Sequence, residues 1–354
     1  MRVLVTGGTG FVGAHSVKAL LDAGHEVRLL VRAPDRIAAA LGPLGIGSVD
    51  HVVGDVTDPG AVRRALDGCE AVLHAAGVYA LARGRAAEMG SVNARGTEVV
   101  LGAAHALGLD PIVHVSSYSA LLPPGADGVL TADAPVGHPA GPYARSKAEA
   151  ESIARRLQQL GAPVTITQPG TVWGPHDPHM GESARIAMTI LRGRMPIALP
   201  GPLAIVDVRD VANVHTAVMR RGLGPRRFLV VAADVMFADL IDTVRRATGR
   251  RLPAVGFAAG LARRTIGARR SVPGNLEGPW IAMQGARCDG SATEAALGLS
   301  LRPPEESVTD TIRWLHATGE LDDRRAGRIA RQTSDRDSAI PSTAGGTGPS
   351  RWAP

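Results

Sequence analysis

A glycine-rich turn near the start of the chain constrains the fold more than any other feature. Residues 6–13 read TGGTGFVG, directly after a β-branched run at Arg2–Thr6 and directly before a helical pattern. In that context Gly7 allows a tight turn, Gly10 lets a pyrophosphate approach the backbone, and Gly13 permits close helix packing. With 43 glycines in the chain, such a triplet alone is weak, so the flanking elements carry the prediction. The segment predicts a dinucleotide site whose contacts also include Thr9, Phe11 and Val12.

Short β-branched runs alternate with longer helical stretches through the first half of the chain. This alternation is typical of βαβ units and a parallel sheet. The expected strands are Arg2–Thr6, Glu26–Val31, Ser48–Val53, Ala71–His74, Pro111–Ser116 and Val164–Gln168. The expected helices are Gly13–Gly24, Pro59–Asp67, Asn93–Leu107 and Tyr143–Leu160. We predict an α/β fold, a Rossmann-type doubly wound parallel sheet with its ligand site at the carboxyl ends of the strands.

The alternation weakens after Pro169, which predicts two parts and a tail. Residues 1–168 form the predicted dinucleotide-binding domain, and residues 169–321 mainly a smaller, mixed substrate lobe, with 203–220 returning to the first domain. Helices are expected in the second part at Glu182–Arg192, Val211–Arg220, Phe237–Thr248 and Ser307–His316. Residues 322–354 are rich in Arg, Asp, Ser, Thr, Gly and Pro, so a disordered tail with no catalytic role is predicted.

Composition limits the partners that such a chain can have. Aromatic residues make up 3% of the chain, which argues against a nucleic-acid stacking platform despite the net charge of +6. Residues 245–270 hold eight arginines and no acidic residue, which indicates a solvated face or a surface for an anionic substrate or membrane. No apolar run is long enough to span a membrane, and the first residues lack a signal peptide. We therefore expect a cytoplasmic protein.

Neither the cysteines nor the histidines predict a metal centre. Cys69 and Cys288 lie far apart without companion ligands, which indicates no disulfide framework and a reducing compartment. The HDPH segment at His176–His179 brings two histidines and one aspartate together in the sequence. However, proline interrupts the segment, and it does not offer a third clear metal ligand. No metal is predicted.

The end of the second strand bears on the choice of cofactor. An NAD-preferring site places an acidic residue about 20 residues after the glycine turn, whereas this strand ends at Arg32. A guanidinium there, with Arg36 as a second contact, suits the 2′-phosphate of NADP. Asp35 stands nearby and could instead hold the ribose of NAD. We predict NADP, with NAD as the alternative.

Two further segments are candidates for cofactor contacts. Asp55, followed by Val56, comes after the third strand, where its carboxylate could accept from the adenine amino group. The alternative is a turn or helix-cap role before Pro59. The small residues Ala75, Ala76 and Gly77 end the fourth strand and would let a cofactor lie against the backbone, although small residues also serve ordinary packing.

A tyrosine and a lysine four residues apart predict the chemistry. Tyr143 and Lys147, in YARSK, share one helix face, and the chain holds only three tyrosines and two lysines. An ammonium beside a phenol favours the phenolate, so Tyr143 is a candidate acid/base, rather than an exposed tyrosine lying over a lysine stem. The preceding strand ends at Ser116 and Ser117. We choose Ser117 over Ser116 or Ser119 as a donor to the substrate oxygen, with local strand capping as the alternative.

Together these motifs resemble the extended short-chain dehydrogenase/reductase superfamily, in its epimerase/dehydratase-like group. The matching segments are TGGTGFVG, GDVTD, HAAG, VNARGTEVVL, VHVSS, YARSK, QPGTVWGP and IVDVRDVA, in family order. The resemblance implies Ser117, Tyr143 and Lys147 as the active-site triad, with Lys147 on the nicotinamide ribose and Asn93 supporting the helix. It adds Pro169 and Thr171 to the cofactor contacts. It also implies a homodimer through Asn93–Leu107 and Tyr143–Leu160.

Departures from the family pattern narrow the expected reaction. Tyr118 and Ser119 stand where sugar-nucleotide dehydratases have an Asp-Glu pair, which disfavours dehydration. Gln168 and Thr171 replace residues that many sugar-nucleotide members share. The segment Val31–Pro34 is similar to dihydroflavonol-reductase-like and hydroxysteroid-dehydrogenase-like members.

We therefore predict an NADP(H)-dependent oxidoreductase acting on a secondary alcohol or ketone of a small or alicyclic substrate. The apolar stretch Leu252–Leu261 could line such a pocket, although helix packing also explains it. Two alternatives remain: a sugar-nucleotide epimerase with tightly bound NAD, and a non-enzymatic protein that senses a dinucleotide.

Overall fold

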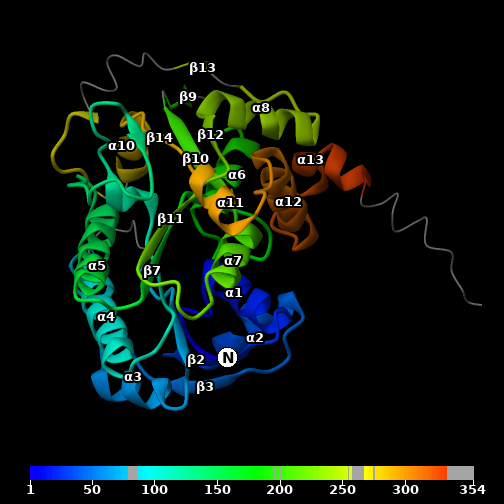
Figure 1. Cartoon of the computed structure of the whole chain (residues 1–354). Helices are drawn as coiled ribbons and strands as arrows, with labels where there is room; N and C mark the ends of the chain where they lie inside the picture. The colour runs from blue at the N-terminus through cyan, green and yellow to red at the C-terminus, as the bar shows by residue number, and fades with distance from the viewer. Residues whose placement is uncertain are drawn as a thin grey trace, which may run out of the picture.

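A seven-stranded parallel sheet forms the centre of the molecule (Figure 1). The computed structural model describes residues 1–78, 86–194, 197–199, 201–253, 255–256, 267–273 and 276–332. The strand order is β11-β7-β5-β4-β1-β2-β3, so the chain reverses its direction of travel across the sheet between β1 and β4. Ligands of doubly wound folds bind at the carboxyl ends of the strands flanking such a reversal. The strands are β1 Arg2–Thr6, β2 Glu26–Val31, β3 Asp50–Val53, β4 Ala71–His74, β5 Ile112–Val115, β7 Val164–Pro169 and β11 Arg226–Val230.

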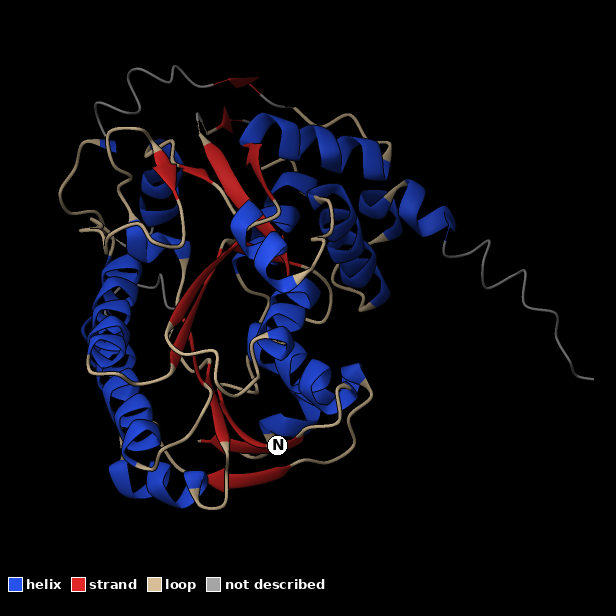
Figure 2. Ribbon diagram, viewed as in Figure 1, coloured by secondary structure: helices blue, strands red, loops and turns tan. Residues whose placement is uncertain are grey.

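Helices cover both faces of this sheet, and alternation along each strand explains why (Figure 2). Val3 and Val5 of β1 pack into one buried cluster, whereas Leu4 between them packs into another. Neighbouring side chains of a strand point to opposite faces, so a strand buried on both sides is apolar throughout. One face carries α1 Phe11–Asp22, α2 Arg36–Leu41 with a short 3-10 turn at Gly42–Leu44, and α7 Val208–Ala217. The other carries α3 Pro59–Leu66, α4 Ala86–Ala106 and α5 Pro142–Gln159.

The predicted fold class is confirmed, and most element boundaries lie close to those predicted. Several helices start earlier than the sequence indicated, among them α12 (Pro304–Ala317), which begins at Pro304 rather than Ser307. α4 begins at Ala86 rather than Asn93. α7 begins at Val208 rather than Val211, because Asp207 caps it by accepting a hydrogen bond from the backbone N–H of Arg209 (2.8 Å). Within the described part of the chain, no helix is both long and apolar enough to cross a membrane.

A smaller lobe sits over the carboxyl edge of the sheet. Its core gathers around Trp173 and Phe237, which are both fully or almost fully buried. A three-stranded sheet, ordered β12-β10-β8, and two pairs of very short strands support this core. The strands are β6 Val129–Leu130, β8 Thr171–Trp173, β9 Ile197–Ala198, β10 Pro202–Asp207, β12 Ala233–Met236, β13 Val255–Gly256 and β14 Arg287–Cys288. The helices are α6 Glu182–Leu191, α8 Phe237–Thr248, α10 Glu277–Met283, α11 Ser291–Leu297, α12 Pro304–Ala317 and α13 Asp323–Ala326, with a 3-10 turn at Tyr118–Leu121.

The chain crosses between the two parts more often than the sequence indicated. β11 pairs with β7 in the central sheet, although the sequence predicts that residues 169–321 belong mainly to the lobe. Of the segment 203–220, α7 packs against α1 in the main domain, whereas β10 lies in the lobe sheet. β6 in turn pairs with β14 of the lobe. Backbone pairing between segments distant in sequence decides these memberships, and local periodicity does not report it.

The prediction of a disordered tail beginning at Asp322 is wrong for the first eleven residues of that segment. Asp322 caps α13 by accepting from the backbone N–H of Arg325 (2.8 Å). Ala326, Ile329 and Ala330 are buried in the lobe core. These few apolar side chains suffice because the lobe core supplies a surface for them to cover. Residues 333–354 lie outside the described residues, as does most of Leu252–Leu261.

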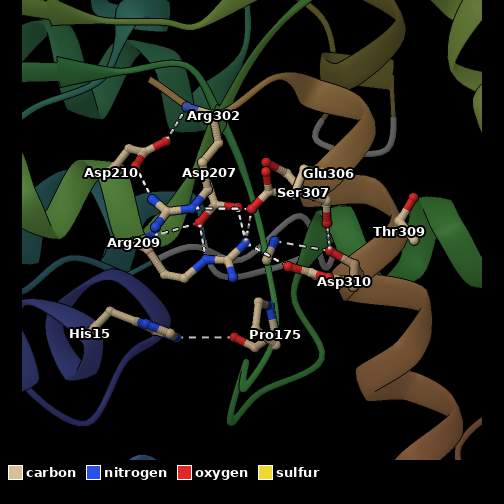
Figure 3. A network of polar contacts seen from close by, with 12 residues as sticks. His15, Pro175, Asp207, Arg209, Asp210, Arg302, Glu306, Ser307, Thr309 and Asp310 are labelled. Atoms are coloured by element: carbon tan, nitrogen blue, oxygen red, sulfur yellow. Dashed lines mark hydrogen bonds and ion pairs between the residues drawn. The ribbon is translucent and has the colours of Figure 1, made fainter. Parts of the chain in front are cut away.

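A network of charged side chains, which we call the α7–α12 joint, fastens the lobe to the main domain (Figure 3). The Arg209 guanidinium pairs with the Asp207 carboxylate (2.7 Å) and with Asp310 of α12 (2.8 Å). Beside it, Arg302 pairs with Asp210. Burial alone would raise the pKa of the fully buried Asp207, but hydrogen bonds from Arg209 outweigh it, and the net shift is downward. The joint therefore balances every buried negative charge with an arginine.

Candidate active site

A cavity of about 560 Å³ lies at the carboxyl edge of the central sheet, beneath the lobe. Both parts of the molecule contribute to its wall, as expected for a site at the reversal point of the sheet. The predicted site residues that line it are Gly7, Gly10, Phe11, Val12, Gly13, Arg32, Arg36, Ala75, Gly77, Ser117, Tyr143, Lys147, Pro169 and Thr171. The predicted residues Thr9, Asp55, Val56, Ala76 and Asn93 lie outside this lining.

The glycine turn is shaped as a cradle that side chains would fill. Gly7 adopts a φ of +75°, and a Cβ built on it would lie 2.6 Å from the backbone nitrogen of Ala76. A Cβ on Gly13 would lie 2.1 Å from the Gly7 carbonyl oxygen. Both positions therefore require glycine. Gly10 is the N-cap of α1, so the backbone N–H groups of the first helical turn face the space where a pyrophosphate would bind. These residues fit a dinucleotide.

Two arginines stand at the end of the cavity that follows β2. Arg32 and Arg36 both line it, and the Arg32 side chain is 60% exposed. The Arg32 guanidinium lies 3.9 Å from the Asp55 carboxylate, a loose ion pair. Neither Asp35 nor Asp55 lines the cavity. The local charge on the cavity wall is therefore positive.

Asp55 and Val56 occupy positions behind the cavity. The Asp55 carboxylate accepts hydrogen bonds from the backbone N–H (2.9 Å) and the hydroxyl (2.7 Å) of Thr57. This is the turn role that the sequence left open, although the N-cap of α3 is Asp58. Val56 packs on α4, where a Cβ built on Gly96 would lie 2.8 Å from it. An adenine contact by either residue stays a prediction.

The hydroxyl of Ser117 is the one that meets the candidate acid/base. Ser117 ends the segment after β5 and accepts hydrogen bonds from the backbone N–H (3.3 Å) and the hydroxyl (3.0 Å) of Ser119. Its side chain also hydrogen-bonds the Tyr143 phenol. The neighbouring Ser116 hydroxyl is buried with no partner among the described residues. Since Ser119 donates to Ser117, the Ser117 proton is left to point toward the phenol or a bound oxygen.

Lys147 lies on the same face of α5, deeper in the cavity. Its ammonium group donates to the carbonyl oxygen of Val115 (3.2 Å), and a Cβ built on Gly77 would lie 3.6 Å from it. The lysine therefore reaches the gap between the ends of β4 and β5. Burial lowers the pKa of Lys147 to about 8, and the charge of Glu151, one turn further along α5, opposes this shift.

The proton affinity of Tyr143 differs from the expectation. The sequence suggested that Lys147 would favour the phenolate. Instead, burial raises the pKa of Tyr143, the nearby Glu277 carboxylate raises it further, and the hydrogen bond from Ser117 only partly compensates. In the protein on its own, the phenol therefore stays protonated well above neutral pH. The expectation considered a single charged neighbour, whereas burial and Glu277 act in the opposite direction.

Asn93 lies behind the catalytic helix. Its side-chain oxygen accepts from the backbone N–H of Val78 (2.7 Å), and its amide nitrogen donates to the Val78 carbonyl (3.2 Å) and to the Ser146 hydroxyl (2.9 Å). Ser146 lies between Tyr143 and Lys147 in α5 and donates to the Tyr143 carbonyl (2.7 Å). Asn93 thus ties the segment after β4 to α5, which makes it a positioning residue.

The histidine-rich segment forms part of the cavity wall. The Asp177 carboxylate accepts backbone N–H groups from His179 (3.0 Å) and Gly181 (2.7 Å), so it shapes the loop. His15 of α1 donates to the Pro175 carbonyl oxygen (3.0 Å), and burial lowers the pKa of His15 to about 4 (Figure 3). Over the described ranges, no three His, Cys, Asp or Glu side chains gather in a way that could hold a metal ion.

Two lobe carboxyl groups reach the cavity that the sequence did not reveal. Glu277 is the first residue of α10, and Glu182 is the first residue of α6. Both line the cavity, and a Cβ built on Gly278 would lie 3.2 Å from a Glu182 carboxyl oxygen. Burial raises the pKa of Glu182 to about 7, with a further contribution from the charge of Glu277. Neither residue belongs to a motif, so only the folded chain brings them to the site.

Comparisons with known proteins agree with this architecture. A family model described as the NAD dependent epimerase/dehydratase family matches residues 3–231. The chain is 29% identical over 333 residues to a sterol demethylase protein B from Methylococcus capsulatus, an alignment that covers 91% of this chain and 100% of that protein. It is 29% identical over 334 residues to a putative dihydroflavonol 4-reductase from Synechocystis sp., covering 89% and 94%. The crystal structure of gox2253 matches it with a TM-score of 0.76 and 28% identity, covering 91% and 99%.

Proposed function

Because the chain belongs to the NAD-dependent epimerase/dehydratase family, we propose that it is an NADP(H)-dependent oxidoreductase that interconverts a ketone and a secondary alcohol on an alicyclic substrate. It is an enzyme of the NAD(P)-dependent oxidoreductase type, and epimerisation belongs to the same family. One observation carries the proposal. A single cavity joins the glycine turn, the arginine pair and the Ser117–Tyr143–Lys147 group.

Each end of the dinucleotide has residues that suit it. The turn from Gly7 to Gly13 would hold the pyrophosphate on the N-terminus of α1. Arg32 and Arg36 would hold the 2′-phosphate, because guanidinium groups bind phosphate through charge-assisted hydrogen bonds. Lys147 would reach the nicotinamide ribose from the floor of the cavity. When bound, the nicotinamide supplies or accepts the hydride.

The remaining chemistry falls to the side chains around the substrate oxygen. Tyr143 gives its proton to that oxygen as a carbonyl is reduced and takes it back when an alcohol is oxidised. Ser117, with its proton free to point away from Ser119, donates a second hydrogen bond where negative charge develops. Asn93 keeps α5, and hence Tyr143 and Lys147, in place.

The lobe side of the cavity and the names of two relatives both support an alicyclic substrate. Ile186, Leu203 and Ile281 line the lobe side of the cavity, a wall suited to an alicyclic skeleton. Sterol and dihydroflavonol, named in two relatives, are both polycyclic oxygenated compounds. Gln168 donates to Glu151 (2.7 Å) and does not line the cavity, which gives a sugar diphosphate one fewer contact.

The cofactor preference gives the first test. Titration of the purified protein with NADPH and NADH, followed by nicotinamide fluorescence, should show tighter binding of NADPH. Arg32→Asp should weaken NADPH binding about 10- to 100-fold, because a charge-assisted hydrogen bond is worth about 1.5 to 3 kcal/mol. Arg63→Asp, an exposed change on α3 with the same charge reversal, is the control and should leave both affinities unaltered. Co-purified NAD without a preference for NADPH would contradict the proposal and favour the epimerase.

The predicted homodimer has its own test. α4 and α5 pack against each other on one face of the sheet, where they would meet the same helices of a second copy. Small-angle scattering of the protein in solution should give the mass of two chains. A monomeric mass would contradict this part of the proposal.

A further inference from the structure

The catalytic helix α5 begins without a capping side chain of its own. Gly141, at its N-cap, has no side chain, and Pro142, its first residue, has no backbone N–H. The next N–H groups belong to Tyr143 and Ala144. Both donate to Glu277, one to each carboxyl oxygen, over 3.1 Å and 2.7 Å. A carboxylate at a helix N-terminus satisfies unpaired donors and is favoured by the helix dipole.

The contact is close, and the lobe supplies it. Glu277 is 1% exposed, and a Cβ built on Gly141 would lie 2.2 Å from its carboxyl carbon. The capping group therefore requires a glycine at 141. Glu277 opens α10, whose Gly278 and Ile281 line the cavity. Helix α10 of the lobe, which borders the substrate space, is therefore hydrogen-bonded to the backbone of Tyr143, the candidate acid/base.

The same carboxylate acts on the phenol through its charge. Burial and Glu277 both disfavour the phenolate of Tyr143, while the Ser117 hydrogen bond favours it. Lys147, on the same helix face, donates to a backbone carbonyl rather than to the phenol. The negative neighbour therefore prevails over the positive one.

Other charges around Glu277 come from two helices. Arg145, on the exposed side of α5, lowers the pKa of Glu277, whereas burial raises it more strongly. Glu182 of α6 lies on the cavity side, and the charge of Glu277 raises its pKa. The two backbone donors both require an acceptor, which the ionised carboxylate provides at each oxygen.

We propose that Glu277 is a positioning residue that fixes the first turn of α5 from the lobe side and places a negative charge near the Tyr143 phenol. The role of Tyr143 as the proton donor rests on the proposed function. In reduction, the substrate carbon gains a hydride from the reduced cofactor, which is oxidised. The substrate oxygen takes the proton as the phenol O–H bond breaks, leaving a phenolate to be reprotonated from solvent.

The test follows Tyr143 directly, without cofactor or substrate. Phenolate absorbance in the ultraviolet is titrated against pH, and the signal of Tyr143→Phe is subtracted to remove the other two tyrosines. Glu277→Gln should lower the midpoint of Tyr143 by about 1 pH unit, since one adjacent charge typically shifts a pKa by 1 to 3 units. Glu149→Gln removes an exposed carboxylate from the same helix and should leave the midpoint unaltered. Far-ultraviolet circular dichroism confirms at each pH that the variants are folded.

A second measurement covers the case in which alkaline pH unfolds the variant. Hydrogen exchange at neutral pH should be about tenfold faster at the Tyr143 and Ala144 amides of Glu277→Gln, because one accepting oxygen is lost. An unaltered Tyr143 midpoint, or an equal shift in Glu149→Gln, would overturn the proposal, as would unaltered exchange. Failure to bind NADPH would contradict the proposed function alone, since these readouts need no cofactor.

Discussion

The lobe meets the main domain at two places that handle charge in opposite ways. At the α7–α12 joint, Arg209 lies between Asp207 and Asp310, so the buried carboxylate has a guanidinium partner. At the contact between α10 and α5, Glu277 binds two backbone N–H groups, and the adjacent Glu182 adds a second carboxyl group. The first contact is neutralised, whereas the second leaves negative charge beside Tyr143.

The two contacts therefore have different roles. The α7–α12 joint stabilises the fold, and the contact between α10 and α5 sets the electrostatic environment of Tyr143. At the first contact, hydrogen bonds from Arg209 lower the pKa of Asp207, whereas burial outweighs Arg302 at Asp210 and raises its pKa. At Glu182 and Glu277, burial is the largest influence and raises the pKa of each carboxyl group. Perturbed pKa values gather at functional sites. We therefore expect changes at the first contact to affect stability, and changes at the second to affect catalysis.

The largest expected effect is on catalysis at the α10–α5 contact. Tyr143→Phe should lower the rate of ketone reduction about 100- to 10,000-fold, because a positioned acid contributes that much. The melting temperature and the affinity for NADPH should remain close to those of the unaltered protein. Steady-state kinetics with a ketone substrate and a thermal melt measure the two effects. A variant that kept full activity would remove Tyr143 from the mechanism.

The next largest effect is on the stability of the fold, at the α7–α12 joint. Arg209→Ala would leave Asp207 buried without its guanidinium, which should lower the free energy of unfolding by about 3 kcal/mol. Urea denaturation measures this loss. Arg313→Ala is the matched control, because Arg313 also pairs with Asp310 but is half exposed. Its substitution should lower the free energy of unfolding by less than about 1 kcal/mol. Equal losses in the two variants would contradict the special importance of the buried Asp207–Arg209 pair.

The smallest effect is the pH dependence of stability, which should have opposite signs for Glu182 and Asp207. Glu182 binds its proton more tightly in the folded protein, with its pKa raised from 4.5 to about 7, so its contribution is lost as the pH rises through that interval. Asp207, whose pKa is lowered, contributes stability that is lost as the pH falls below its ordinary value of 3.8. Buried histidines such as His15, whose pKa is lowered from 6.5 to about 4, contribute a slope of the opposite sign in part of this range, so the measurement compares the protein with Glu182→Gln. Between pH 4.5 and 7, the unfolding free energy of the protein measured by urea denaturation should fall relative to that of the variant, and a constant difference between the two would contradict the prediction.

Much of the fold follows from short-range pattern. The run Arg2–Thr6, the glycine turn and the following helix could be predicted because each element obeys its own periodicity and the turn requires glycine at fixed spacing. Lobe membership could not be predicted in the same way, since β11 joins the central sheet only through pairing with β7. Ile329 and Ala330 become ordered only because the lobe core offers a surface to cover.

The residues of the candidate site also fall into two groups, those predictable from local sequence and those placed only by the fold. The sequence alone determined the glycine cradle, Arg32 at the end of a strand, and the spacing that puts Tyr143 and Lys147 on one helix face, because all of these are local. Only the tertiary structure decided that Glu277, distant in sequence, caps the helix at Tyr143 and adds its charge there. Electrostatic effects depend on distance in space and on burial, and neither quantity is written in the order of residues.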